Sequence, residues 1–433
     1  MKRSSAAEPT NDALLDDLRR QTFGYFLHEV NPANGLVADS TQEGSPSSIA
    51  AVGFALALYP IGVKHGLMTR DEAIQRTLTT LRFFRNSSHG TARDATGYKG
   101  FYYHFLDMRT GRRTWRSELS TIDTTFLLAG MLTAAEYFDA DTASEREIGT
   151  LAGELYRRAD WQWALDGGDT VSHGWTPETG FIKYRWQGYS EALLLYVLGL
   201  GSPTHPLPAR SYAAWSSTYQ WRKLYGHEFL YAGPLFIHQF SHLWVDFRGI
   251  QDAFMRAHEI DYFENSRRAT YVQQAYGRRN PRRFAGYGED CWGLTASHGP
   301  GPATRRIHGV ERRFRDYVAR GVPHGPDDGT IAPWAALASL PFAPEIVLPA
   351  LRHFDQLGLK VSDPYGFKAT FNETFPLKND RIGWVSPWHL GINQGPIIMM
   401  IENYQTGWLW TLMRRCEPLV TGLRRAGFLN GWL

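Results

Sequence analysis

One acidic residue, Asp123, lies within an apolar stretch where a carboxyl group is costly to bury. At about 3.6 residues per turn it shares a helix face with apolar neighbours, so its side chain should point toward the core or the mouth of the fold. A buried carboxyl needs either a partner or a raised pKa, and a raised pKa is what a general acid requires near neutral pH. The apolar neighbours are Leu119, Ile122, Phe126 and Leu127.

A second acid, Glu191, has a similar place at the start of the most apolar helix predicted in the chain. Leu194 and Leu195 follow it at the i+3 and i+4 positions, on the same helix face. Taken alone, either acid is better explained as a helix cap or as the partner of an arginine. Two such acids, together with Glu118 and an aromatic surround, support acid–base catalysis as well as they support a structural role.

Aromatic residues are frequent, with 15 Trp, 21 Tyr and 24 Phe in 433 residues. Many of these rings must form the core, but an excess of Trp and Tyr also suits a groove that stacks against the flat apolar faces of sugar rings. Six rings fall in predicted loops or at helix ends, beside polar residues. Each alone could be a core residue, but together they predict sugar subsites. They are Trp115, Trp175, Trp186, Tyr189, Trp292 and Trp388.

Two further motifs each have a structural and a functional interpretation. Asp246 and Arg248 place an acid and a cation on one short stretch, which predicts either a salt bridge or hydrogen bonds to sugar hydroxyl groups. His238 and His242 have the i, i+4 spacing of zinc ligands, but Gln239 stands where a zinc protease needs its glutamate. We therefore expect these histidines to lie in the core or a groove, and we predict no metal site.

The segment 305–320 is rich in arginine, although Glu311 and Asp316 dilute its charge. A solvated loop or helix is the favoured interpretation, ahead of a binding site for a polyanion. The sequence has no phosphate-binding or dinucleotide-binding glycine motif. Residues 188–192 lack the second glycine of a nucleophile elbow, which argues against a serine hydrolase.

The overall composition narrows the class of protein. Lys and Arg exceed Asp and Glu by 46 to 43, a formal net charge of +3, which argues against a nucleic-acid-binding protein. Apolar residues make up 43% and charged residues 21%, as in globular proteins, and no apolar run is long enough to span a membrane. Cys291 and Cys416 are the only cysteines, so they could form one disulfide or remain free thiols.

The N-terminal segment is basic at its start but has no apolar h-region, so no signal peptide is visible. We expect a cytoplasmic protein from the sequence as written, or a periplasmic one if a signal was removed. We predict a tail over residues 1–13 and a single domain over residues 14–433. A monomer or a weak dimer is expected.

The candidate residues are carried by predicted helices, and evidence for long strands is weak. The clearest helix covers 118–138, with Ser117 placed to cap its start. Nearly continuous apolarity at 50–58 and 192–200 indicates helices that are buried on most sides. Long aromatic loops, at 99–117, 166–189 and 277–329, are where a site is usually built on a rigid scaffold.

The number of helices predicts the architecture. About twelve helices in one chain of this length indicate an all-α fold, an (α/α)6 barrel in which six inner helices are ringed by six outer ones. The other predicted helices cover 11–28, 47–65, a segment that starts at Asp71, 144–160, 188–200, 236–258, 260–276, 330–340, 344–357, 393–411 and 412–426.

Several strings of residues, taken in order, resemble one family. They are GLVAD at 35–39, SELSTIDTTFLLAG at 117–130, GYSEALLLYVLGLGSPTHP at 188–206, GLTASHGP at 293–300, DGTIAPWAALASLPFAP at 328–344 and GINQGPIIMMIENYQTGWLW at 391–410. They are similar to the bacterial glucoamylase-like domain, whose members include the β-1,2-glucanases of glycoside hydrolase family 144. The resemblance extends from about residue 14 to about residue 420.

The resemblance implies an (α/α)6 barrel that acts on β-1,2-glucan or its oligosaccharides by inverting hydrolysis, without a cofactor. Glu191, in the GYSEA string, matches the family's acid and is the first choice for general acid. Asp123, in the STIDT string, is a candidate base or a ligand of the sugar at the cleavage point. Glu118, Trp388 and Gln394 match positions near the cleft, and the segment 302–314 resembles an insertion that shapes substrate length.

The chain departs from this family at two positions. Many members carry Asp where this chain has Asn393 and His298. If the base belongs at the first of these positions, the alternatives are a transglycosylase on the same barrel and a non-catalytic glucan-binding protein. A polysaccharide lyase, which also uses this kind of barrel, is the least favoured reading. Neither a nucleic acid nor a membrane is expected as a partner.

Overall fold

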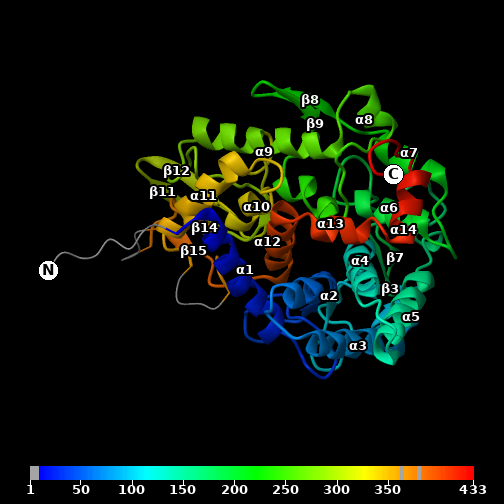
Figure 1. Ribbon diagram of the computed structural model, residues 1–433. Helices are drawn as coiled ribbons and strands as arrows, with labels where there is room; N and C mark the ends of the chain where they lie inside the picture. The colour runs from blue at the N-terminus through cyan, green and yellow to red at the C-terminus, as the bar shows by residue number, and fades with distance from the viewer. Residues whose placement is uncertain (1–8, 361–364, 378–381) are drawn as a thin grey trace.

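The computed structural model describes residues 9–360, 365–377 and 382–433 of the chain (Figure 1). Residues 1–8 of the predicted N-terminal tail therefore lie outside the described residues. The described chain is predominantly helical, and its longest strands have five residues. This confirms that helices dominate and that long strands are lacking in the described part of the chain.

Four helices at the centre of the molecule are buried along most of their length. Their sequences are apolar on every face, so they gain stability only where protein surrounds them. They contact one another in order, from α2 to α4 to α6, and α12 returns to α2. The short helix α10 (Pro333–Leu337) and two 3₁₀ turns, Leu235–His238 and Phe240–Leu243, complete this centre. The four helices are α2 (Ile49–Lys64), α4 (Thr121–Tyr137), α6 (Leu193–Gly201) and α12 (Gly391–Gln405).

A second set of helices lies outside the first and buries only one face of each helix. Polar side chains cap several of their starts, such as Thr69, which forms a capping box with Glu72. In Figure 1, α3 and α5 lie beside α2 and α4, and these helices contact one another. The outer helices are α1 (Asn11–His28), α3 (Arg70–Asn86), α5 (Ala143–Arg158), α7 (Ala209–Ser216), α9 (Tyr262–Arg279), α11 (Pro344–Gln356) and α14 (Glu417–Arg425). The shorter α8 (Ala253–Ala257) and α13 (Trp408–Met413) fill connections.

Short antiparallel strands build the loops between helices. Five of them form one sheet in the order β2 (Gly97–Tyr98), β3 (Phe101–Tyr103), β5 (Leu119–Ser120), β6 (Gly174–Thr176) and β7 (Gly180–Phe181). The other pairs are β1 (Ser47–Ser48) with β4 (Phe105–Leu106), β8 (Trp221–Leu224) with β9 (His227–Leu230), β10 (Ala296–Ser297) with β13 (Val318–Ala319), β11 (Ala303–Ile307) with β12 (Val310–Phe314), and β14 (Phe371–Asn372) with β15 (Trp384–Val385).

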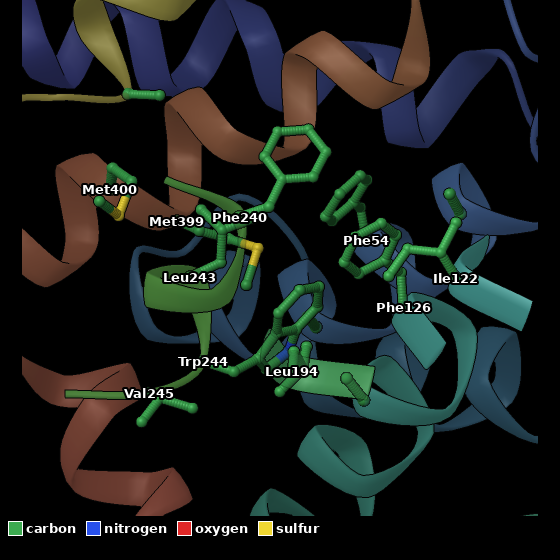
Figure 2. Close-up of a cluster of buried hydrophobic side chains, with 14 of the residues drawn as sticks. Phe54, Ile122, Phe126, Leu194, Phe240, Leu243, Trp244, Val245, Met399 and Met400 are labelled. Atoms are coloured by element: carbon green, nitrogen blue, oxygen red, sulfur yellow. The ribbon is translucent and has the colours of Figure 1, made fainter. Parts of the chain in front are cut away.

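Aromatic rings fill the space between the central helices (Figure 2). The Trp244 ring stacks on Phe54 with centroids 5.7 Å apart and on Phe126 with centroids 5.9 Å apart. Its indole N–H donates to Thr133 Oγ1 at 3.1 Å, so the buried polar group is satisfied. At Gly53 and Gly130 the backbones of α2 and α4 touch, and a Cβ on either residue would collide with the other helix. This packing makes the centre a rigid base for the loops at its ends.

Several predicted helix boundaries were wrong. The helix predicted at 118–138 begins at Thr121, because residues 119–120 pair as a strand and Ser120, not Ser117, caps the helix. The segment 236–258 is not one helix but two 3₁₀ turns and the short α8. The segment 393–411 breaks at Gly407, whose φ of 62° ends one helix before the next begins. The predictions at 188–200 and 412–426 shorten to α6 and α14.

Three other expectations can be compared with the structure. The arginine-rich segment 305–320 contains strands instead of the predicted loop or helix, but most of its arginines are exposed, as expected of a solvated segment. Cys291 and Cys416 are both buried free thiols, so the disulfide alternative is wrong. Among the described residues, no helix has both the length and the apolar character needed to cross a membrane.

Candidate active site

The strands and turns that precede the central helices bring four acids and a histidine to one end of the molecule. The backbone N–H of Ile49, at the start of α2, donates to His104 O at 3.2 Å, and the N–H of His104 donates to Glu118 O at 2.9 Å. Gly391, at the start of α12, donates its N–H to Asp39 O at 2.9 Å. Because α4 and α6 begin at the same end, Asp123 and Glu191 complete the cluster.

His104 lies at the centre of this cluster. Its Nδ1 is 2.9 Å from Glu118 Oε1, and its Nε2 is 3.6 Å from Asp123 Oδ2. The imidazole stacks on the Phe105 ring at 3.9 Å, which fixes its plane. Burial lowers the pKa of His104, but the negative charges of Asp123, Glu118 and Asp39 outweigh burial and raise the pKa to about 9. The ring is therefore a cation at neutral pH.

The carboxyl of Asp123 is held in place by its own helix end. Its side chain is 8% exposed, and Ser120 Oγ donates to Asp123 Oδ2 at 2.5 Å. The backbone N–H of Asp123 donates in turn to Ser120 Oγ at 3.1 Å, so the cap and the acid fix each other. Within the described residues, Oδ1 of this carboxyl has no hydrogen-bond partner and can accept one from water or a sugar.

Glu191 differs from the other acids because no cation of the described residues pairs with it. Ser241 Oγ donates to its backbone carbonyl at 3.2 Å, but no side chain of the described residues donates to its carboxyl. Burial raises its pKa to about 7, and repulsion by Asp123 adds to the effect, while its own backbone N–H opposes it. Glu191 is therefore an acid that still holds its proton just below neutral pH.

Two residues that the sequence did not single out border the acids. Asp39 has a raised pKa, first because of burial and then because of Asp123, whereas the charges of His104 and His298 lower it. The side chain of Tyr317 is 63% exposed, yet partial burial and the charges of Glu191, Asp123 and Asp39 raise its pKa to about 12. Tyr317 therefore lies within electrostatic range of these acids. His298 lies against its ring, with centroids 5.1 Å apart.

The predicted aromatic residues separate into two groups. Trp115 is 66% exposed beside Phe105, and Trp388 is 37% exposed in the turn before α12, so both offer a face to a ligand. Trp186 is 8% exposed, stacks on His173 and donates its indole N–H to Thr121 Oγ1 at 3.0 Å, so it supports the start of α4. Trp175 is half-buried between Tyr98 and Trp163.

One predicted aromatic subsite is wrong, and Tyr189 is only partly exposed. Trp292 is fully buried, and a residue with no exposed surface cannot stack on a sugar. The Tyr189 ring packs against Tyr262 and His238, with centroids 5.9 and 5.1 Å away, and burial raises the pKa of its hydroxyl well above the usual value. The sequence did not distinguish these rings from those of the cleft, because loops at both ends of the helices carry aromatic residues.

Asp246 and Arg248 form the salt bridge and do not reach the cleft. Asp246 Oδ1 accepts from Arg248 Nε at 2.7 Å, and Arg414 pairs with its other oxygen. The Arg248 guanidinium lies over the Trp410 ring at 4.7 Å, beyond the C-terminal end of α12. The prediction of a salt bridge is therefore confirmed, and the prediction that this pair binds sugar in the cleft is wrong.

Asn393 and Gln394 lie in the first turn of α12, next to the backbone contact with Asp39. Both side chains are buried, with 6% and 1% exposed. Gln394 Oε1 is a buried acceptor that lacks a hydrogen-bond partner among the described residues. Such an atom is costly unless a ligand or water donates to it.

Two groups of residues have ligand atoms suited to a metal. His104, Glu118 and Asp123 each bring one such atom within 4.8 Å of the others. Because the pKa of His104 is raised, its imidazole would have to release a proton before it could bind a metal. His238 and His242 are buried, and burial lowers their pKa values to about 4 and about 3. They bond to Ala232 O and Ser266 Oγ, as core histidines do.

The comparison with known proteins agrees with the strings found in the sequence. Residues 183–417 match the family described as "Putative glucoamylase". A solved structure of a protein with the same description, from Bacteroides uniformis, is 32% identical and superimposes with a TM-score of 0.86, covering 99% of this chain and 100% of that one. This chain belongs to the glucoamylase-like family.

Two relatives of this glucoamylase-like chain have more specific names. One is an exo β-1,2-glucooligosaccharide sophorohydrolase (non-reducing end) of Parabacteroides distasonis, 28% identical over 452 residues. The alignment covers 96% of this chain, which spans 58% of the length of that curated relative. The other is the endo-β-1,2-glucanase of Chitinophaga pinensis, solved with sophorotriose and glucose, 26% identical with a TM-score of 0.86, covering 98% of this chain and 100% of that one.

Proposed function

We propose that this protein is a glycoside hydrolase that cleaves β-1,2-linked glucan or its oligosaccharides with inversion, and that Glu191 is the general acid. The observation that carries the proposal is the Glu191 carboxyl, whose pKa is raised to about 7, which has no cation partner among the described residues, and which senses the charge of Asp123. The names of the relatives from Parabacteroides distasonis and Chitinophaga pinensis support β-1,2-glucan as the substrate class.

The proposal includes the architecture that positions these acids. Along the chain, outer and buried elements alternate: α1 and α2, α3 and α4, α5 and α6, α7 and the 3₁₀ turns, α9 and α10, then α11 and α12. This alternation supports an (α/α)6 barrel within a single domain. In such a barrel the inner helices run in one direction, so their starts meet at one end, which is where the acids lie.

In the proposed reaction, Glu191 donates its proton to the glycosidic oxygen as the bond to the anomeric carbon breaks. A water on the opposite face attacks that carbon and gives its proton to a carboxylate, for which Asp123 Oδ1 is the candidate acceptor. Inverting pairs of carboxyls stand about 6.5–9.5 Å apart to leave room for this water. Tyr317, Trp115 and Trp388 have the exposed surface needed to contact the sugar rings.

A second candidate function uses the same acid with a different acceptor. Asn393 presents an amide at the start of α12, and an amide cannot remove a proton from water. If the family's base belongs at that position, a sugar hydroxyl of another glucan could replace water and give its proton to Asp123 Oδ1, and the enzyme would be a transglycosylase. This alternative predicts a change in chain lengths without new reducing ends.

The test is incubation of the protein with linear β-1,2-glucan, followed by a reducing-end assay, separation of products by length and NMR of the anomer first released. New reducing ends of inverted configuration support hydrolysis. A changed length distribution without new ends supports transfer, and binding without any product supports a glucan-binding protein.

The role of Glu191 is tested by Glu191→Gln, with Glu289→Gln as a matched exposed control. Turnover should fall by about 10²–10⁴-fold while oligosaccharide binding is retained, as expected when a general acid is removed. A folded Glu191→Gln protein with undiminished turnover would overturn this role, and so would one that no longer binds oligosaccharide.

A further inference from the structure

The arginine-rich hairpin formed by β11 and β12 lines a pocket that the proposed reaction does not use. The pocket has a volume of about 510 Å³, and four arginines contribute to its wall: Arg282, Arg312, Arg313 and Arg315. Two acids, Glu311 and Asp327, also line it. The formal charge of these side chains is therefore positive, which raises the question of what balances it.

The acids of the pocket do not neutralise the arginines. Asp327 accepts from the hydroxyls of Tyr276 at 2.7 Å and Tyr287 at 2.6 Å, so both of its oxygens are used by neutral donors. Glu311 lies opposite Arg306 in the hairpin, but its side chain forms no salt bridge with any described residue. The positive charge of the pocket is left without a carboxylate partner from the described protein.

Arg312 is fixed in the pocket wall by contacts that leave its charge in place. Its guanidinium lies over the Phe284 ring at 4.6 Å and donates to the carbonyls of Arg282 at 3.2 Å and Arg283 at 2.9 Å. Directly across the hairpin stands Arg305, which stacks on Phe375 at 3.8 Å. Like charges in such a cross-strand pair are destabilising. An anion at this surface would relieve that repulsion.

Arg313 and Arg315 have side chains with donors to spare. Neither guanidinium has a hydrogen-bond or ion-pair partner in the part of the chain that the structure describes. Their backbones are nevertheless fixed, because Arg313 pairs with Thr304 in the hairpin and the N–H of Arg315 donates to Asp328 Oδ2 at 2.8 Å. A planar fork of N–H donors on a fixed backbone matches the oxygens of a phosphate or a carboxylate.

We propose that this pocket is a binding site for an oxyanion of the phosphate or carboxylate class. The site borders the candidate active site, because Arg315 precedes Tyr317 by two residues and the charges of the acids act on the Tyr317 hydroxyl. At about 3.6 Å per residue, the Cα atoms of Arg315 and Tyr317 are at most about 7 Å apart. The anion can therefore be a free ion or an acidic group carried by a saccharide in the cleft.

The experiment measures binding by calorimetry at constant ionic strength, with inorganic phosphate and glucose 6-phosphate as probes and glucose as the uncharged control. The test variants are Arg313→Ala and Arg315→Ala, alone and together, because neither side chain supports the fold. The matched control is Arg306→Ala, which removes the same charge from the same hairpin outside the pocket wall. Melting curves verify that each variant is folded.

The expected result is saturable binding of both anions and none of glucose. Each test variant should weaken binding by about tenfold or more, since a hydrogen bond to a charged group is lost, and Arg306→Ala should leave it unchanged. Tighter binding of glucose 6-phosphate than of phosphate would indicate an anion carried by a sugar, and equal binding a free one. The proposal is overturned if no anion binds saturably, if the double variant binds as well as the wild type, or if Arg306→Ala causes the same loss.

Discussion

Buried carboxyls lie at both ends of the central helices, but they have different neighbours. At the C-terminal ends, Glu402 is fully buried between Lys64 and His65, the latter at 2.6 Å, and Asp246 pairs with Arg248 and Arg414. Burial raises the pKa of both acids, but hydrogen bonds and charges from these partners outweigh burial and lower it below the usual value.

At the opposite end the acids outnumber the cations. Asp39, Glu118 and Asp123 lie around the imidazolium of His104, and Glu191 has no cation partner in the described residues. The pKa values of Asp39 and Glu191 are raised accordingly. The side chains of Glu402 and Asp246 are fully buried, whereas Asp39 and Glu191 are partly exposed, so surface burial does not explain why the pKa falls at one end and rises at the other. The supply of cations explains it: an acid paired with cations contributes to stability, and an acid without one keeps a proton that it can donate.

The largest expected effect that separates the two ends is on stability. Glu402→Gln leaves Lys64 beside a buried amide, and breaking a buried pair in this way should cost about 3 kcal/mol of the free energy of unfolding. The kcat on β-1,2-glucan should stay as in the wild type. Denaturant unfolding and a reducing-end assay measure the two quantities. Lost activity in folded Glu402→Gln protein would contradict the division between the two ends.

The pH dependence of turnover gives the next largest effect. Because the pKa of Glu191 is raised to about 7, its acid form disappears above that pH, and kcat should fall about tenfold for each further pH unit. The alkaline limb of a pH–rate profile measures this. A limb that stays at pH 9 or above would show that a different group supplies the proton.

The ionisation of Glu191 should also make the stability of the fold depend on pH. The folded-state pKa of Glu191 lies above the usual 4.5, so the folded protein binds more protons, and this acid lowers stability progressively as pH rises from 4.5 to about 7. Glu191→Gln lacks that loss. The melting temperature of the variant minus that of the wild type should therefore increase over this range and be constant above it.

We predicted the helices from the pattern of apolar residues along the chain. This pattern was most reliable where helices are buried on all sides. Residues 50–58 and 192–200 read as buried helices and lie within α2 and α6. The pattern failed at 236–258, because burial, not helix geometry, makes that stretch apolar. It also placed the start of α4 too early, since a strand and a helix carry the same residues at their junction.

Only those site residues whose neighbours in the sequence are unusual could be predicted. Asp123 and Glu191 stood out because apolar residues flank them in the sequence. His104, Asp39 and Tyr317 did not, because each comes from a loop that is distant along the chain and joins the acids only through the fold. The sequence pointed to these three only through longer segments: the GLVAD string that ends at Asp39, and the long loops at 99–117 and 277–329.

A smaller effect is expected from the cation that the acids share. His104→Gln keeps a donor toward Glu118 but removes the positive charge, so repulsion among the carboxyls should bring a proton onto one of them. The acidic limb of the pH–rate profile should then move upward by about one pH unit, which reduces turnover about tenfold on that limb. An unchanged acidic limb in folded His104→Gln protein would exclude this electrostatic role.

The charge of His104 should also make the free energy of unfolding depend on pH. Its folded-state pKa of about 9 lies above the usual 6.5, so its contribution is complete below pH 6.5 and is lost as the pH rises to about 9. The unfolding free energy of the wild type should therefore decline over that window relative to His104→Gln. This readout separates a charged imidazole from one that only fills space.

The smallest effect tests the residue that the sequence placed at the wrong end. Arg248 is 52% exposed and Asp246 retains Arg414, so Arg248→Ala should cost only about 1 kcal/mol of stability, including the lost contact over Trp410. The KM for β-1,2-glucan should not change, because the side chain lies beyond the C-terminal end of α12, whereas the acids lie at its start. A raised KM with unchanged stability would restore the sugar-binding interpretation of Arg248 and show that the substrate reaches both ends of the helices.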